Sequence, residues 1–221
     1  MLGLRINTNS NDSLRVLCLG AHCDDIEIGC GGTVLKLADV SRHLEVRWVV
    51  FSSDERRKRE ALKSAEAFLS AIPNHEIAIY TLRDGYFPHV GTELKELFEQ
   101  LKSGFSPNII LTHYRNDLHQ DHRMVSELTW NSFRNHLILE YEIPKYDGDF
   151  GSPNAFVNLE QAIADRKIDI ILDAFRSQTE KHWFSHELFS AVLRLRGMEA
   201  NSPTGYAEGF YSRKLNLTLE A

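Results

Sequence analysis

Two short stretches of the sequence bring together side chains that can bind a metal ion or move a proton. The first, AHCDDIEIGCGG, covers residues 21–32 and places His22, Asp24 and Asp25 directly after an apolar run. The second, HQDH, covers residues 119–122. Two histidines and a carboxylate with an open coordination position are typical of catalytic zinc sites. A cation would also offset the cost of burying adjacent carboxylates.

Both stretches follow predicted β-strands. The apolar run 13–21, with a glycine at position 20, predicts a strand buried on both faces of a parallel sheet. The run 108–114 predicts another strand, which ends next to the HQDH stretch. Ligands of open parallel sheets bind at the carboxyl ends of the strands, so we expect the two stretches to meet in one crevice.

The spacing within each stretch suggests a division of roles. Side chains that follow one another in an extended segment point in opposite directions, so one of Asp24 and Asp25 could bind metal while the other faces a water molecule. His119 and His122 are three residues apart and project from one face of a helical turn. One of these histidines could therefore be a ligand while the other reaches the substrate.

The elements that must position these residues alternate between strand and helix. Further strands are expected at 44–53, 76–82, 136–143, 155–159 and 205–217, and helices at 31–43, 54–72, 91–104, 119–133, 160–175 and 179–200. This order predicts an α/β fold with a Rossmann-like, mostly parallel sheet flanked by helices, and with additional C-terminal strands. We expect a single domain over residues 1–221, with an exposed loop at 144–154 that forms a wall for the substrate.

Composition limits the partners and the compartment. The chain has 221 residues and a formal net charge of −6, which argues against nucleic acid and anionic membranes as partners. No apolar stretch approaches the roughly 20 residues of a membrane span, and residues 1–13 lack the layout of a signal peptide. Cysteines occur only at positions 18, 23 and 30, an odd number that predicts reduced thiols in a cytoplasmic protein.

The motifs resemble those of the zinc-dependent N-deacetylases of the LmbE/PIG-L type, which remove acetyl from N-acetylglucosamine-like groups on sugar conjugates. That family opens with Ala-His-Pro-Asp-Asp, an acid two residues further on and then Gly-Gly, and this chain has AHCDDIE at 21–27 followed by glycines 31 and 32. The family's His-x-Asp-His corresponds to 119–122. Shorter similarities are an Arg-x-x-Glu-Ala element at 57–61 and YAEGF at 206–210.

The resemblance, which spans about residues 14–213, implies a role for each motif residue. It implies three ligands for one Zn²⁺ per chain, or for another divalent ion: His22, Asp25 and His122. It implies that Asp24 is the general base for the attacking water. It also implies that His119 stabilises the oxyanion or protonates the leaving amine, with Asp121 tuning His119. The one departure is Cys23 in place of proline, which puts a thiol beside the metal site.

Other residues and functions are also compatible with the sequence. Four further residues are expected to contact the small amino-sugar substrate: Arg57, His113, Tyr141 and Glu208. One alternative function is a nucleotide-binding Rossmann-like module, although GCGGT at 29–33 lacks the lysine of a phosphate-binding loop and favours close helix packing. Another is a catalytically silent metal-binding homologue. The sequence leaves the number of subunits open, a homo-oligomer included.

Overall fold

The computed structural model describes residues 3, 13–41 and 43–216. Its centre is a seven-stranded sheet of order β3-β2-β1-β4-β5-β7-β6. The strands are β1 (Leu14–Gly20), β2 (Leu44–Val50), β3 (Asn74–Ile79), β4 (Ile109–His113), β5 (Leu137–Tyr141), β6 (Ala155–Leu159) and β7 (Tyr206–Tyr211). Strands β1 to β5 pair in parallel, whereas β7 runs antiparallel to both β5 and β6. The predicted mostly parallel sheet with additional C-terminal strands is confirmed.

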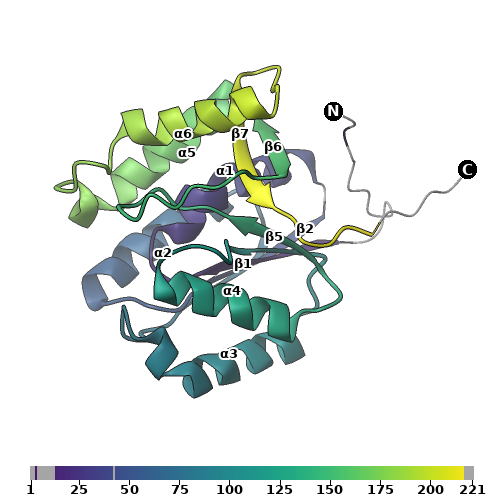
Figure 1. Ribbon diagram of the computed structural model, residues 1–221, viewed down its shortest axis with the longest axis vertical. Helices are drawn as coiled ribbons and strands as arrows, with labels where there is room; N and C mark the ends of the chain where they lie inside the picture. Colours follow the sequence, from purple (N-terminus) through teal and green to yellow (C-terminus); the bar gives the residue numbers. More distant parts are fainter. Residues whose placement is uncertain (1–2, 4–12, 42, 217–221) are drawn as a thin grey trace, which may run out of the picture.

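Helices cover both faces of the sheet (Figure 1). One core cluster packs α1 (Asp25–Val40), α2 (Glu55–Leu69), α5 (Gln161–Ala174) and α6 (His186–Glu199) on one side. The second cluster packs α3 (Gly91–Gly104), α4 (Gln120–Ser132) and the short 3₁₀ helix η1 (Phe87–His89) on the other. A further 3₁₀ helix, η2 (Arg176–Gln178), leads from α5 toward α6. Two separate apolar cores therefore hold the central strands in place.

Strand β1 contributes side chains to both cores. Val16 and Cys18 belong to one cluster, and Leu17 and Leu19 belong to the other, all of them fully buried. This double burial is what the continuous apolar run predicted. Strand β1 lies between β2 and β4, so the order of the strands reverses its direction along the sheet at β1. In open parallel sheets such a switch point opens a crevice at the carboxyl ends of the strands.

Helix α1 begins earlier than the sequence predicted, at Asp25 rather than at residue 31. Asp24 is its N-cap with φ −121° and ψ −1°, so the two aspartates diverge because one precedes the helix and the other opens it. The predicted extended pair is therefore wrong. The glycines lie inside the helix, where a Cβ on Gly29 would lie 2.1 Å from the Tyr141 ring and one on Gly31 would lie 2.6 Å from Phe68. Their predicted role in close packing is confirmed.

Some other boundaries also differ from the prediction. Helix α6 begins at His186 rather than at 179, because the Ser185 side chain accepts from the Leu188 N–H and caps it there. Strand β3 covers 74–79 instead of 76–82, and β7 ends at 211, while residue 217 and most of the N-terminal segment used for the compartment prediction lie outside the described residues. Among the described residues, no helix combines the length and the apolar character that crossing a bilayer requires.

Candidate active site

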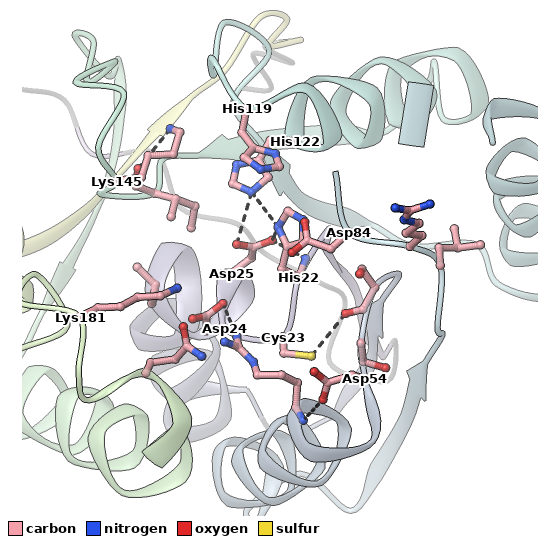
Figure 2. Close-up of a pocket in the computed structure, with 18 of the residues that line it drawn as sticks. His22, Cys23, Asp24, Asp25, Asp54, Asp84, His119, His122, Lys145 and Lys181 are labelled. Carbon is pink, nitrogen blue, oxygen red and sulfur yellow. Dashed lines mark hydrogen bonds and ion pairs between the residues drawn. The ribbon is translucent and has the colours of Figure 1, made fainter. Parts of the chain in front are cut away.

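A cavity of about 450 Å³ lies where β1 and β4 end. Its wall includes seven residues that the sequence had singled out: His22, Cys23, Asp24, Asp25, Arg57, His119 and His122. Figure 2 shows the histidines and Asp25 gathered on one side of the cavity, with Asp24 apart from them. The two motifs, about a hundred residues apart in the chain, therefore meet in one site.

Three potential ligand side chains converge in this site. His22 Nδ1 lies 3.1 Å from His122 Nε2 and 3.4 Å from Asp25 Oδ2. His122 Nε2 lies 3.6 Å from Asp25 Oδ1. A tetrahedral Zn²⁺ with bonds of about 2.0–2.1 Å separates its ligand atoms by about 3.3 Å. The donor types and their separations therefore fit one divalent ion. Neighbouring donor groups, Asp25 with His113 and His122 and also His22 with His119 and His122, are close enough to contribute as well.

Carboxylates on the far side of each histidine ring fix which nitrogen faces the other ligands. His122 Nδ1 lies 2.9 Å from Asp117 Oδ2, so it carries the proton and Nε2 is bare. His22 Nε2 lies 3.2 Å from Asp121 Oδ2 and 3.0 Å from Asp84 Oδ1, so it donates, and Nδ1 is the nitrogen that faces His122 and Asp25. Two ring nitrogens and the Asp25 carboxylate therefore face one another, an arrangement that a cation between them would stabilise.

Shifted pKa values distinguish the three candidate ligands: His122 and Asp25 are deprotonated at neutral pH, whereas His22 is charged and loses a proton if it binds a metal ion. Burial lowers the pKa of His122 to about 4. The pKa of Asp25 lies well below its usual range, because His122 and His113 outweigh the opposing effect of burial. Burial also opposes charge on His22, but its contacts with carboxylates, above all Asp121, raise its pKa well above the usual value.

The turn between β1 and α1 holds Asp25 in place. The His22 N–H donates to Asp25 Oδ2 over 2.6 Å. From the end of β4, His113 brings its Nε2 to 3.1 Å from the same oxygen, and that nitrogen accepts from the Ala21 N–H over 2.9 Å. His113 is fully buried and does not line the cavity, so the structure places it behind Asp25 rather than on the substrate side.

Asp24 faces the opposite wall of the cavity from the histidines. Its Oδ1 lies 2.9 Å from Arg57 Nη2. Burial and the neighbouring Asp25 raise the pKa of Asp24, whereas Arg57 lowers it. Arg57 had been expected to contact substrate, and it lines the cavity while paired with Asp24. The carboxylate is thus kept near the cavity, outside the set of converging ligand atoms.

His119 lies at the N-terminus of α4. It is the N-cap residue, and its Nδ1 accepts from the Asp121 N–H over 3.3 Å, so the proton of the neutral ring belongs on Nε2. Its ring centroid lies 4.8 Å from that of His22 and 4.6 Å from that of His122. Burial and the charge of His22 lower the pKa of His119. The ring is therefore a neutral hydrogen-bond donor at neutral pH.

The Asp121 side chain does not contact His119 in the way that the sequence suggested. It turns back to accept from the Gly85 N–H over 2.7 Å and from the Phe87 N–H over 3.1 Å. It also lies against His22. Residues two apart in a helix do not face each other, and so the carboxylate positions His22 and the loop before η1 instead.

Two residues expected to contact substrate lie away from the cavity. Tyr141 is fully buried and donates its hydroxyl to the Leu19 carbonyl over 2.6 Å. Glu208 accepts from the backbone N–H groups of Gly32 and Thr33 and pairs with Lys167 Nζ at 2.6 Å. Both side chains point from the sheet into the core beneath α1, so they support the helix and the substrate expectation for them is not met.

Several cavity residues were missed by sequence reasoning: Asp84, Lys145, Gln178, Lys181 and Trp183. Asp84 follows β3, whose carboxyl end lies at the same sheet edge, so its position after a strand was a usable signal. Lys145 lies within the loop that had been predicted to form a wall. The other three come from the segment between α5 and α6, most of which had been predicted as helix.

Cys23 is less exposed to chemistry than its sequence position suggested. The residue is 2% exposed and its thiol donates to the Ser52 carbonyl over 3.3 Å. Figure 2 shows the sulfur pointing away from the histidines. Burial raises its pKa to about 12. Because the thiolate is the reactive and metal-binding form, the thiol is inert at neutral pH. All the cysteines of the chain are free and buried.

Fold and site together define an open α/β protein with a polar cavity at the switch point of its sheet and a donor set suited to a divalent cation. The chain belongs to the PIG-L family, since the family model described as GlcNAc-PI de-N-acetylase matches residues 17–133. The match begins in β1 and ends just after α4, and so it includes both motifs.

Solved structures share this fold over nearly the whole chain. The conserved protein TT1542 from Thermus thermophilus is 21% identical with a TM-score of 0.74, and the match covers 93% of this chain and 97% of that one. The 4-carboxy-2-hydroxymuconate hydratase GalB from Pseudomonas putida is 17% identical with a TM-score of 0.74, covering 94% and 99%. The N,N'-diacetylchitobiose deacetylase from Pyrococcus horikoshii is 21% identical with a TM-score of 0.64, covering 91% and 84%. Identities this low establish the fold alone.

Proposed function

We propose that this chain is a zinc-dependent hydrolase that removes the acetyl group from an N-acetylglucosamine-like amino sugar or its conjugate. Membership of a family described by a de-N-acetylase supports this function. The observation that carries it is the convergence of two histidine ring nitrogens and the Asp25 carboxylate, with separations of 3.1–3.6 Å, beside a second carboxylate that lies outside this set. A cavity of about 450 Å³ is large enough for a sugar.

In this proposal the ion is held by His22, Asp25 and His122. When bound, Zn²⁺ supplies Lewis-acid polarisation of the amide carbonyl and makes water a better nucleophile. The neutral state of His122 and the ionised state of Asp25 suit this role, since a ligand must have lost its proton to bind metal.

Asp24 acts as the general base. It takes one proton from the attacking water while the water oxygen forms a bond to the carbonyl carbon. A raised pKa suits a base, because a carboxylate of ordinary pKa is a weak proton acceptor at neutral pH. The same proton then passes to the amine as the C–N bond breaks, which releases acetate and the free amino sugar.

His119 stabilises the carbonyl oxygen as negative charge develops on it. Its Nε2–H is free to donate because Nδ1 is engaged with the Asp121 N–H. The lowered pKa keeps the ring neutral, which favours hydrogen-bond donation over transfer of a full proton. Asp121 contributes by orienting His22.

The alternative functions predict different chemistry. A nucleotide-binding module needs backbone N–H groups free to cradle phosphate. In this chain the Gly32 N–H donates to Glu208, and Gly29 and Gly31 are packed against the rings of Tyr141 and Phe68. A hydratase such as GalB shares the fold, yet a hydratase adds water without releasing acetate. A silent homologue would bind metal and leave N-acetyl sugars intact.

The test is acetate release from a panel of N-acetylated sugars and conjugates by the purified protein loaded with Zn²⁺. The panel includes N-acetylglucosamine, N,N'-diacetylchitobiose and nucleotide-linked and lipid-linked N-acetylglucosamine, and both acetate and new primary amine are measured. We expect equal amounts of the two products from at least one substrate, and far smaller amounts from the Asp24→Asn variant. Metal binding without any acetate from the panel would favour the silent homologue.

A further inference from the structure

Lys145 lines the cavity, but its ammonium group is already occupied. Nζ lies 2.9 Å from Asp117 Oδ2, contacts both oxygens of Asp149 at 2.5 and 2.6 Å, and reaches the Ile143 carbonyl over 3.4 Å. An ammonium group has three hydrogens, and these contacts use them all. The side chain is only 12% exposed. Lys145 is therefore poorly suited to binding substrate through its charge, and its contacts indicate what it does instead.

The carboxylate of Asp117 links Lys145 to the candidate metal site. The oxygen that accepts from Lys145 also lies 2.9 Å from His122 Nδ1, and the other oxygen accepts from the His119 N–H over 2.7 Å. Asp117 is itself 2% exposed. A carboxylate on the far nitrogen of a ligand histidine fixes the ring and its tautomer. The same carboxylate thus orients His122 and anchors the backbone of His119.

Asp149, the second carboxylate that accepts from Lys145, also contacts the loop that precedes α4. Its Oδ2 accepts from the Leu118 N–H over 2.7 Å while Oδ1 accepts from Lys145. One ammonium group therefore lies between two carboxylates from different segments, residues 114–119 and residues 142–154. Without that charge the carboxylates of Asp117 and Asp149 would repel each other and the two segments would separate.

We propose that Lys145 is a positioning residue of the metal site, holding Asp117 against His122 and thereby joining the cavity wall of residues 142–154 to a metal ligand. This inference rests on the metal site proposed above. It assigns to the loop a role in setting the metal site, in addition to enclosing the substrate.

If Lys145 is a positioning residue, its removal should change the affinity for a metal ion in the direction opposite to that expected from charge alone. Removing a positive charge from the cavity wall should strengthen the binding of a cation. Lys181 provides that comparison, because it lines the same cavity and has no ion-pair partner among the described residues. If Lys145 acts through Asp117, its loss should instead weaken metal binding, since the orientation of His122 is lost.

The test measures Zn²⁺ affinity by chelator competition on folded protein, without reference to any substrate. We expect Lys145→Met to bind Zn²⁺ about 10–100-fold more weakly than the wild type, the usual effect of losing a partner of a metal-ligating histidine. Lys145→Arg should restore most of the affinity because it keeps a bridging cation. Lys181→Met should bind as tightly as the wild type or more tightly. The visible spectrum of the Co²⁺-loaded protein should change in Lys145→Met alone.

A double-variant cycle tests whether Lys145 acts through Asp117. Asp117→Asn should weaken Zn²⁺ binding by itself, and adding Lys145→Met to it should cause little further loss. Full additivity of the two losses would overturn the proposal, as would unchanged or tighter binding by a folded Lys145→Met variant. Absence of metal from the wild type would instead overturn the proposed function on which the inference rests. Thermal unfolding of each variant establishes that it is folded.

Discussion

The two adjacent aspartates at the start of α1 have different neighbours, which shift their pKa values in opposite directions. Asp25 opens the helix beside His22, His113 and His122, which hold its pKa well below the usual range. Asp24 precedes the helix, and burial together with Asp25 raises its pKa despite the guanidinium of Arg57. Environments that push the pKa values of neighbouring carboxyl groups apart commonly mark an acid–base pair or a ligand–base pair.

Substitution of each aspartate by asparagine separates the base from the ligand. We expect Asp24→Asn to retain metal near the wild-type content while kcat falls by about 10²–10⁴-fold, because the proton acceptor is gone. Asp25→Asn should lose metal, since a neutral amide is a poorer ligand than a carboxylate. Elemental analysis and acetate release are measured on each purified variant. Loss of metal from Asp24→Asn with retention by Asp25→Asn would show that the roles are exchanged.

Arg57 should set the acid limb of the pH–rate profile. A base with a raised pKa is active above that pKa, and its activity is lost as pH falls through it. Arg57 lowers the pKa of Asp24, so Arg57→Gln should raise it and move the acid limb of kcat to higher pH. The measurement is kcat against pH for wild type, Arg57→Gln and Arg59→Gln, an exposed arginine of the same helix that serves as control. An unmoved acid limb in Arg57→Gln would mean that Asp24 is not the titrating base.

At the scale of elements, a buried ion pair between Glu208 and Lys167 holds helix α1 against the sheet. Glu208 of β7 accepts from the N–H groups of Gly32 and Thr33 and from Lys167 of α5, which also donates to the Ile28 carbonyl. Both charged side chains are 2% exposed. The motif at 206–210 is thus a support for the helix that carries Asp25.

Removing the charge of Glu208 should destabilise the fold. Glu208→Gln leaves the Lys167 ammonium buried without a counter-charge, and we expect a loss of about 3–5 kcal/mol in the free energy of unfolding. The measurement is urea denaturation monitored by circular dichroism. Glu160→Gln is the control, because its ion pair with Lys36 is partly exposed and should contribute at most about 1 kcal/mol. Similar losses in both variants would contradict a special role for the buried pair.

At the scale of the whole molecule, the candidate ligands come from both sides of the switch point. His22 and Asp25 follow β1, whereas His122 lies in α4, which follows β4. An ion bound to all three would join two segments that the unfolded chain does not hold together. Metal binding should therefore stabilise the folded state specifically.

Chelation of the metal should lower the melting temperature. With free Zn²⁺ at 100 times its Kd, binding contributes about 2.7 kcal/mol, which corresponds to roughly 5–10 °C for a chain of this size. The shift is measured by calorimetry before and after chelation and after Zn²⁺ is restored. Asp25→Asn should show almost no shift. An equal response of the wild type and this variant would mean that the ion binds elsewhere.

The sequence by itself was enough to predict the order of strands and helices, because apolar periodicity is a local property of the chain. It also located the crevice, since a short polar motif after each of two buried strands places both at the carboxyl edge of a parallel sheet. His22, Asp24, Asp25, His119 and His122 all line the cavity as that argument requires. What these residues do chemically remains the proposal tested above.

Only the tertiary structure decided which side of each element a functional residue faces. Tyr141 and Glu208 point into the core beneath α1, although β5 leads toward the site and β7 lies beside it. Asp117 and Lys145 are 28 residues apart in the sequence. Their contact depends on how the irregular segment after β5 packs against the loop between β4 and α4. Such contacts are set by packing between segments distant in sequence, on which local hydrophobic patterns carry no information.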